Sequence, residues 1–209
     1  VYVCPKWFFY HPTSSRADLS KAFSADFPSK EVEYTSADGT KLYGWFVKPA
    51  AGQKIVVFFH GNAYNIESFY HKLIPFVRSG YGVFIGEYRG FGGINGKLGQ
   101  DNLAADAVAA VDYLSALGRQ NTDLILYGMS LGSYMAVNTA FERGRVEPFG
   151  ALILEVPFDS VLNVVKQRFW PVFPFELLVR DHYDNMPKLA QLRLPVLIMG
   201  AENDDVFTK

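Results

Sequence analysis

The stretch GMSLG at residues 128–132 decides the fold of this chain, because of what lies on either side of it. Residues 123–127 form a short β-prone run, and an apolar helical pattern begins at Leu131. A serine in a tight turn from strand to helix has strained backbone, and the flanking glycines leave room for neighbouring elements. Its hydroxyl then projects above the sheet beside a helix N-terminus, which favours negative charge. The stretch therefore predicts Ser130 as a nucleophile; the alternative is an ordinary helix cap.

Short β-rich runs alternate with longer helical patterns on both sides of this motif, which is typical of an α/β protein. The continuous apolar run IVVFF at 55–59 indicates a central parallel strand covered on both faces by helices. The turn SADG at 36–39 predicts an antiparallel hairpin before it. The other expected elements are strands over 82–88, 151–156 and 195–199 and helices over 103–114 and 66–77, the last kinked or shortened by Pro75.

A second signal follows the central strand, where His60 and Gly61 lead into the next helical pattern. A nucleophilic serine needs two backbone N–H groups to hold the oxyanion of a tetrahedral intermediate. The residue after the nucleophile supplies one donor and a loop after this strand supplies the other. We therefore expect an oxyanion hole made by the amides of Leu131 and Asn62, with His60 orienting the loop by hydrogen bonding.

Four motifs occur in order along the chain: HGNAYN at 60–65, GEYRGFGG at 86–93, GMSLG, and LIMGAENDDV at 197–206. This series resembles the α/β-hydrolase superfamily, and within it the branch of membrane-associated hydrolase-domain proteins with patterns close to HGNAGN, DYRGYG and GxSxG. The resemblance covers residues 30 to 206. It implies an α/β-hydrolase fold with a small cap, and a Ser–acid–His triad that acts on esters or thioesters.

The acid of such a triad follows a late strand, and three carboxylates compete after residue 199: Glu202, Asp204 and Asp205. Similarity to the family's Gly-x-x-Asp-x-x-Val loop selects Asp204, with Ala201 in place of the usual glycine. Some hydrolases carry the acid one strand earlier, so Glu155 and Asp159 stay as alternatives.

The base is the difficulty, because the family's chain order is Ser, then acid, then His. The four histidines, at positions 11, 60, 71 and 182, all precede Asp204. His182 falls in the expected cap and would have to enter the site from an unusual element. We therefore expect that the C-terminal part of the fold is missing: a last helix, a last strand and the loop bearing the base. A missing edge strand would leave apolar surface exposed.

The expected domain organisation is an N-terminal arm over 1–28 and a hydrolase domain over 29–209 with a cap at about 157–192. The arm opens with VYVCPKWFFYHP, which reads either as the flank of a lost membrane anchor or as an apolar arm packed on the body. In the cap, Phe169, Trp170 and Phe173 are candidates to line an acyl pocket or to touch a bilayer surface; packing against the core is the alternative.

Composition narrows the classes of function. The 209 residues are 49% hydrophobic, enough for a sizeable core, and the net charge of −1 argues against a nucleic-acid-binding surface. A single cysteine excludes an intrachain disulfide framework and a cysteine-based metal cluster. The glycines at 90–93 do not open a helix after a strand, so they predict a flexible loop rather than a dinucleotide site. We expect no metal and no cofactor.

The sequence thus predicts a serine hydrolase that cleaves carboxylic esters or thioesters with apolar acyl groups through an acyl-enzyme intermediate. The expected substrate is a small-molecule or lipid-like acyl ester, with contact to a membrane surface if the arm follows an anchor. Two alternatives remain open: a serine peptidase of the same fold, and a catalytically inactive hydrolase fold that binds a partner.

Overall fold

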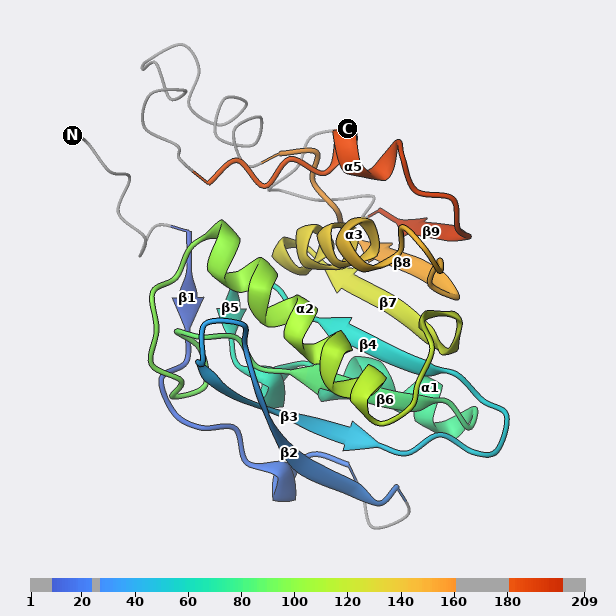
Figure 1. Cartoon of the computed structure of the whole chain (residues 1–209). Coiled ribbons are helices and arrows are strands. Elements are labelled where there is room, and N and C mark those ends of the chain that lie inside the picture. Colours follow the sequence, from blue (N-terminus) through green and yellow to red (C-terminus); the bar gives the residue numbers. More distant parts are fainter. Residues whose placement is uncertain (1–8, 24–26, 161–180, 201–209) are drawn as a thin grey trace, which may run out of the picture.

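The protein is described by a computed structural model that covers residues 9–23, 27–160 and 181–200. Its centre is a seven-stranded sheet in the order β2-β3-β6-β4-β7-β8-β9 (Figure 1). Strands β4, β6, β7, β8 and β9 are parallel, and β2 and β3 form an antiparallel edge. The strands of this sheet are β2 (Ser29–Thr35), β3 (Lys41–Val47), β4 (Ile55–Phe59), β6 (Gly82–Gly86), β7 (Leu124–Met129), β8 (Ala151–Glu155) and β9 (Val196–Met199).

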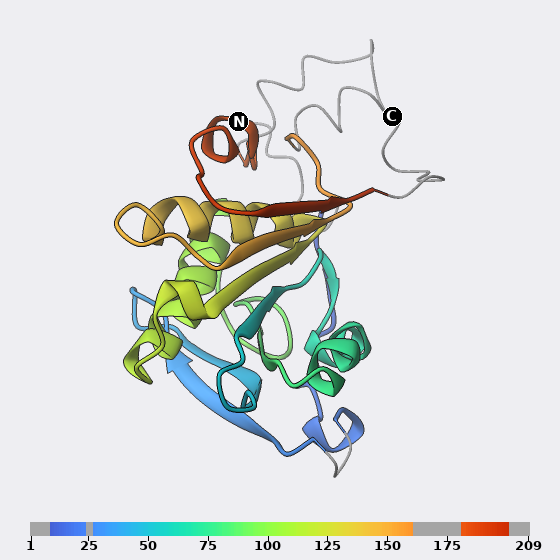
Figure 2. The same ribbon diagram turned by 90° about the vertical axis from the view of Figure 1, so that its right-hand side faces the viewer.

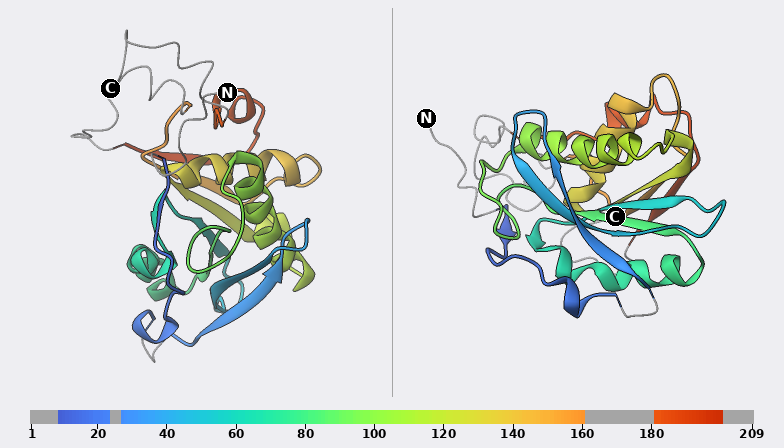
Figure 3. Two further views of the ribbon diagram at one scale, coloured as in Figure 1. Left: turned by 90° about the vertical axis from the view of Figure 1, so that its left-hand side faces the viewer. Right: turned by 60° about the horizontal axis from the view of Figure 1, so that its bottom comes forward.

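Helices cover both faces of the sheet. The long helices α2 (Gln100–Ala116) and α3 (Leu131–Arg143) lie on one face, and the short α1 (Ile74–Arg78) lies on the other (Figures 2 and 3). A further short helix, α5 (Met186–Leu189), packs beside α3. The mostly parallel sheet with helices on both faces is the architecture that the sequence predicted.

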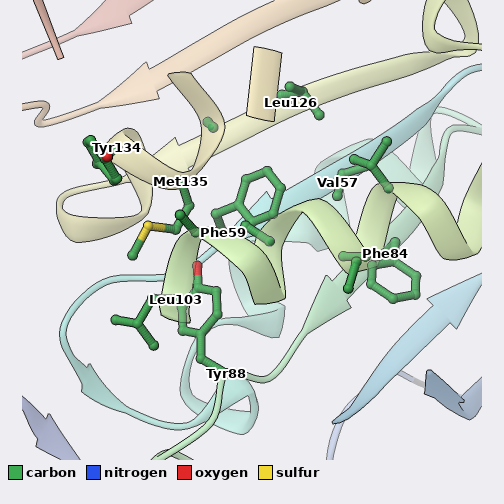
Figure 4. Close-up of a cluster of buried hydrophobic side chains, with 14 of the residues drawn as sticks. Val57, Phe59, Phe84, Tyr88, Leu103, Leu126, Tyr134 and Met135 are labelled. Atoms are coloured by element: carbon green, nitrogen blue, oxygen red, sulfur yellow. The ribbon is translucent and has the colours of Figure 1, made fainter. Parts of the chain in front are cut away.

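Strand β4 is the middle strand, which explains why it has no polar position. Val57 and Phe59 pack with Leu103 of α2 and Met135 of α3 in one cluster (Figure 4). Phe58 points to the opposite face, into the cluster beneath α1. Since successive side chains of a strand alternate between faces, a strand covered on both sides must be apolar throughout.

The expected helix over 66–77 is the element that the sequence predicted wrongly. The chain instead forms two 3-10 turns, η3 (Ile66–Ser68) and η4 (Tyr70–Leu73), before the five residues of α1. Pro75 lies at the start of α1, where its missing N–H costs nothing. The Ile66 N–H is taken by the Glu87 carboxylate (3.0 Å), a tertiary contact that helical spacing does not reveal.

Among the described residues, β9 is the edge strand of the sheet, and its side chains are exposed. Val196, Leu197 and Ile198 are 42%, 54% and 57% exposed. The expectation of apolar surface at this edge agrees with these values. Within the described residues, no helix has the length and apolar character needed to span a membrane.

A small second sheet ties the N-terminal arm to the body. Strand β1 (His11–Pro12) pairs in parallel with β5 (Ala63–Tyr64), which follows the turn after β4. Residues 9–23 therefore lie along the domain rather than apart from it (Figure 1).

Alkaline pH is expected to destabilise this fold through its buried tyrosines. Burial raises the pKa of seven described tyrosines, and the pKa reaches about 12 for Tyr43 and Tyr134. An unfolded tyrosine has a pKa of about 10, so the neutral buried phenols stabilise the fold fully below pH 10 and lose that contribution as pH rises through 12. We expect the free energy of unfolding to fall steadily above pH 10. The seven residues are Tyr10, Tyr34, Tyr43, Tyr88, Tyr127, Tyr134 and Tyr183.

Absorbance at 295 nm checks this expectation, because it follows phenolate formation. These seven tyrosines should ionise together with the loss of folded circular dichroism, above the pH at which tyrosines of an unfolded chain ionise. If all tyrosines ionise near pH 10 while the protein stays folded, the proposed effect of burial is wrong.

Candidate active site

Ser130 lies in the tight turn between β7 and α3. Its backbone has φ 50°, a left-handed conformation that strains any residue other than glycine. Although Ser130 occupies the N-cap position of α3, its side chain makes no capping hydrogen bond. Its N–H donates to the Glu155 carbonyl (2.9 Å), which fixes the turn to the end of β8. The half-buried hydroxyl is thus held at the carboxyl ends of the parallel strands, and it does not act as a helix cap.

The glycines at 128 and 132 are needed for close packing. A Cβ on Gly128 would collide with the carbonyl oxygen of Gly132 in the first turn of α3. A Cβ on Gly132 would collide with the carbonyl oxygen of Phe59 and lie 2.7 Å from that of His60. Only glycine lets α3 begin this near to the end of β4. The two motifs GMSLG and HGNAYN are therefore brought together.

The turn after β4 lies directly against the serine. A Cβ on Gly61 would be 3.7 Å from the Cβ of Ser130. The Leu131 N–H belongs to the first turn of α3, so it has no acceptor within the helix. Among residues 9–23, 27–160 and 181–200, no acceptor is found for the Asn62 N–H either. The two amides expected to form the oxyanion hole thus belong to segments that meet at Ser130.

His60 is fully buried, and hydrogen bonds and aromatic packing hold its ring in place. The ring Nε2 is 2.9 Å from Oε1 of Glu87, and Nδ1 is 2.9 Å from the carbonyl oxygen of Gly61. Tyr88 packs on the ring with centroids 4.3 Å apart. His60 therefore holds the turn, as the sequence indicated, and its ring nitrogens are engaged away from the serine.

The glycine-rich segment after β6 is tightly packed, which corrects the expectation of a flexible loop. Gly92 has φ 52°, and a Cβ there would lie 2.5 Å from Oε2 of Glu87. Arg89 is 3% exposed; its Nη2 donates to Oδ1 of Asp106 (2.6 Å) and its Nη1 donates to Oδ2 of Asp38 (2.5 Å). The hydrogen bonds that Arg89 donates to Asp106 and Asp38 raise its pKa above the ordinary value. The two ion pairs of Arg89 thus join α2 and the β2–β3 turn to the end of β6.

Strained backbone is concentrated around Ser130. Val156 follows Glu155, whose carbonyl accepts the Ser130 N–H, and Tyr64 lies two positions after Asn62. The third strained residue, Tyr183, packs its ring edge-to-face on Tyr134 in the first turn of α3. Such conformations gather where a site needs groups held in fixed directions. The non-glycine residues with positive φ in the described parts are Tyr64 (66°), Ser130 (50°), Val156 (46°) and Tyr183 (48°).

Comparison with protein families agrees with this arrangement. The family model described as serine aminopeptidase, S33, matches residues 50–173, which is more than half of the chain and includes both motifs that meet at Ser130. The chain belongs to this family.

Curated relatives extend the similarity of this S33 family member across nearly the whole chain. It is 32% identical over 182 residues to the uncharacterized protein Rv2307c of Mycobacterium tuberculosis, covering 85% of this chain and 62% of that protein. It is 33% identical over 214 residues to the uncharacterized protein YfhR of Salmonella typhimurium, covering 95% and 70%. The chain thus spans about three fifths of the length of the M. tuberculosis relative.

Solved structures share the fold of this S33 family member. An alpha-beta hydrolase from Vibrio vulnificus superposes with a TM-score of 0.72 at 20% identity, covering 84% of this chain and 64% of that one. The esterase Pf2001 of Pyrococcus furiosus superposes with a TM-score of 0.67 at 19% identity, covering 91% and 75%. These likenesses confirm the α/β-hydrolase fold.

The alternative acid Glu155 is engaged elsewhere. Its carboxylate accepts hydrogen bonds from Nζ of Lys72 (2.7 Å) and from the hydroxyl of Tyr127 (2.6 Å). Burial and the bonded carboxylate raise the pKa of Tyr127. These bonds hold Glu155 toward η4, on the face of the sheet that carries α1. Several other expected site residues lie outside the described residues: Phe169, Trp170, Phe173, Glu202, Asp204 and Asp205.

The remaining histidines are distributed over three elements. His11 on β1, His71 on η4 and His182 in the expected cap are all exposed. His182 precedes Tyr183, which contacts the first turn of α3. Within the described residues, none of these three side chains is hydrogen-bonded to Ser130, and none is assigned a role in the site.

Two contributors to the site had not been expected from the sequence. Glu87 anchors the His60 ring, and the only sequence signal for it is a carboxylate placed directly after a fully apolar strand. The Asn62 side chain donates to the carbonyl of Phe9 (2.7 Å), a contact 53 residues apart that no local pattern predicts.

Proposed function

We propose that this protein is a serine hydrolase that cleaves carboxylic esters or thioesters through an acyl-enzyme intermediate. Ser130 is the nucleophile, and the amides of Leu131 and Asn62 stabilise the oxyanion. The observation that carries the proposal is the strained Ser130 turn, with its hydroxyl uninvolved in capping and the Gly61 backbone packed against it. Family membership supports the same reading, because the S33 model matches this part of the chain.

The rest of the triad is proposed from chain order. Asp204 would orient the catalytic base, which the resemblance implies is a histidine. The 209 residues contain no histidine after position 182. His60 is not proposed as the base, since Glu87 and the Gly61 carbonyl engage both its ring nitrogens.

The proposed substrate is a small-molecule or lipid-like ester with an apolar acyl group. Support comes from the aromatic composition of the segment that contains Phe169, Trp170 and Phe173. Contact with a membrane surface through the N-terminal arm belongs to the same proposal, on the resemblance to membrane-associated hydrolases.

Labelling of the complete protein with a fluorophosphonate probe tests the nucleophile. We expect one covalent adduct, located by mass spectrometry on the peptide that contains Ser130, because an oxyanion hole and an activated serine accelerate phosphonylation together. Heat-denatured protein is the control and should not be labelled. A native protein that resists the probe, or an adduct on another serine, would contradict the proposal.

A peptidase is the second candidate, favoured by the description of the matching family as serine aminopeptidase. The same serine and oxyanion donors would serve both reactions. Turnover of an acyl ester, an acyl thioester and an aminoacyl amide of similar size separates the candidates. We expect kcat/KM to be highest for the ester or thioester; a preference for the aminoacyl amide would favour the peptidase. Labelling without turnover of any of them would point to a different substrate class.

A further inference from the structure

The N-terminal strap, residues 9–13, is hydrogen-bonded to the turn that carries Asn62. The His11 N–H donates to the carbonyl of Asn62 (2.8 Å), and the Asn62 side chain donates back to the carbonyl of Phe9 (2.7 Å). One step further, the Thr13 N–H donates to the carbonyl of Tyr64 (3.0 Å). Asn62 is thus held by the strap through both its backbone and its side chain.

These bonds fix the direction of the Asn62 N–H. The Asn62 N–H and the Gly61 C=O belong to the same peptide group. In a trans peptide these two groups point in opposite directions, so fixing the Gly61 carbonyl also fixes the Asn62 N–H. His60 Nδ1 holds that carbonyl from inside the domain. The next peptide group, between Asn62 and Ala63, is held from outside by the His11 N–H, which donates to the Asn62 carbonyl. With both peptides fixed, the backbone of Asn62 has no freedom to rotate without breaking one of these bonds.

The same strap also contacts the segment around Tyr183. The hydroxyl of Tyr10 is hydrogen-bonded to the hydroxyl of Tyr183, and both side chains are buried. Tyr183 has strained backbone (φ 48°), its N–H donates to Gln100 on α2 (2.6 Å), and its ring packs edge-to-face on Tyr134. Burial raises the pKa of both bonded tyrosines, so their hydroxyls keep their protons at neutral pH.

We infer that the N-terminal strap is a positioning element of the site: through Asn62 and Tyr10 it holds the oxyanion-hole turn and the segment around Tyr183 in register with Ser130. This inference rests on the proposed hydrolase function. Asn62 through its side chain and Tyr10 are then positioning residues, whereas the Asn62 N–H contacts the substrate oxyanion. Because the oxyanion forms only in the transition state, losing the strap should lower kcat and leave KM nearly unchanged.

The test compares Asn62→Ala, Tyr10→Phe and their combination in the complete protein. Displacing a catalytic group by 1 Å can cost about 100-fold in rate, so partial loosening should lower kcat by about tenfold for Asn62→Ala and by about threefold for Tyr10→Phe. Since both changes release one strap, the combined variant should lose less than the product of the two. Tyr81→Phe is the matched control: it removes the same hydroxyl from a half-buried side chain that packs on Phe76 of α1, outside the strap, and should keep kcat unchanged.

Two measurements separate positioning from a general loss of structure. Active-site titration with the fluorophosphonate probe counts intact sites, so kcat is expressed per titrated site. Hydrogen exchange of residues 60–66 follows the turn directly and should accelerate in Asn62→Ala and Tyr10→Phe but not in Tyr81→Phe. The inference is overturned if kcat per titrated site matches the control, if KM changes in place of kcat, or if exchange of residues 60–66 is unaltered.

Failure of the proposed function gives a different pattern. If the wild-type protein is neither labelled nor active while exchange of residues 60–66 still responds to Tyr10→Phe, the hydrolase proposal fails, and with it the catalytic role of the strap. If the wild type is active and both strap variants equal the control, only the strap inference fails.

Discussion

Replacing Ser130 by alanine is expected to abolish hydrolysis while leaving the fold intact. Without Oγ no acyl-enzyme can form, and loss of a triad serine costs kcat about 10⁴-fold or more. Alanine retains the Cβ, so the strain at φ 50° is unchanged, and no capping hydrogen bond is lost. The measurements are kcat on a soluble acyl ester and the midpoint of thermal unfolding.

Ser115→Ala provides the matched control, because Ser115 is exposed on α2, away from the turn. It should keep full activity and full labelling by the fluorophosphonate. If Ser130→Ala remains within tenfold of the wild type, the nucleophile is another residue. If the wild type itself neither reacts with the probe nor turns over any acyl substrate, the inactive, partner-binding reading of the fold becomes the better one.

Much of this arrangement was predictable because its signals are local. The apolar run at 55–59, the turn at 36–39 and the motif around Ser130 each depend on residues next to one another in sequence, and each predicted element is present. The meeting of Ser130 with the turn after β4 also followed, since the carboxyl ends of adjacent parallel strands lie at one edge of the sheet.

The parts that were not predictable depend on long-range polar contacts. The His60–Glu87 pair joins two strands, and the Asn62 bond to Phe9 joins the arm to the turn. In the sequence, Glu87 falls near the end of the expected strand over 82–88, and Arg89 stands just before the glycines at 90–93, which predict a flexible loop. Only the fold reveals that both are buried and paired, and that the segment is closely packed.

The second large effect is expected on stability, at the buried ion pair between Arg89 and Asp106. Arg89 donates to the Asp106 carboxylate from Nη2 (2.6 Å), from Nε (3.0 Å) and from its own backbone N–H (3.0 Å), and Asp106 is 1% exposed. Asp106→Ala leaves the guanidinium buried without this partner and frees the backbone donor as well. Removing one member of a buried pair costs about 3–5 kcal/mol. Urea unfolding should therefore give a free energy lower by about that amount.

Two further variants decide whether burial is the cause. Asp38 also binds Arg89 (2.5 Å), but its side chain is 53% exposed, so water can replace it and Asp38→Ala should cost much less stability than Asp106→Ala. The paired variant Arg89→Met with Asp106→Leu removes both charges together, and it should be more stable than Asp106→Ala because no unpaired charge remains buried. Equal losses for Asp38→Ala and Asp106→Ala would contradict this explanation. A paired variant no more stable than Asp106→Ala would instead mean that the pair acts through its geometry, as the clamp that joins α2 and the β2–β3 turn to the end of β6.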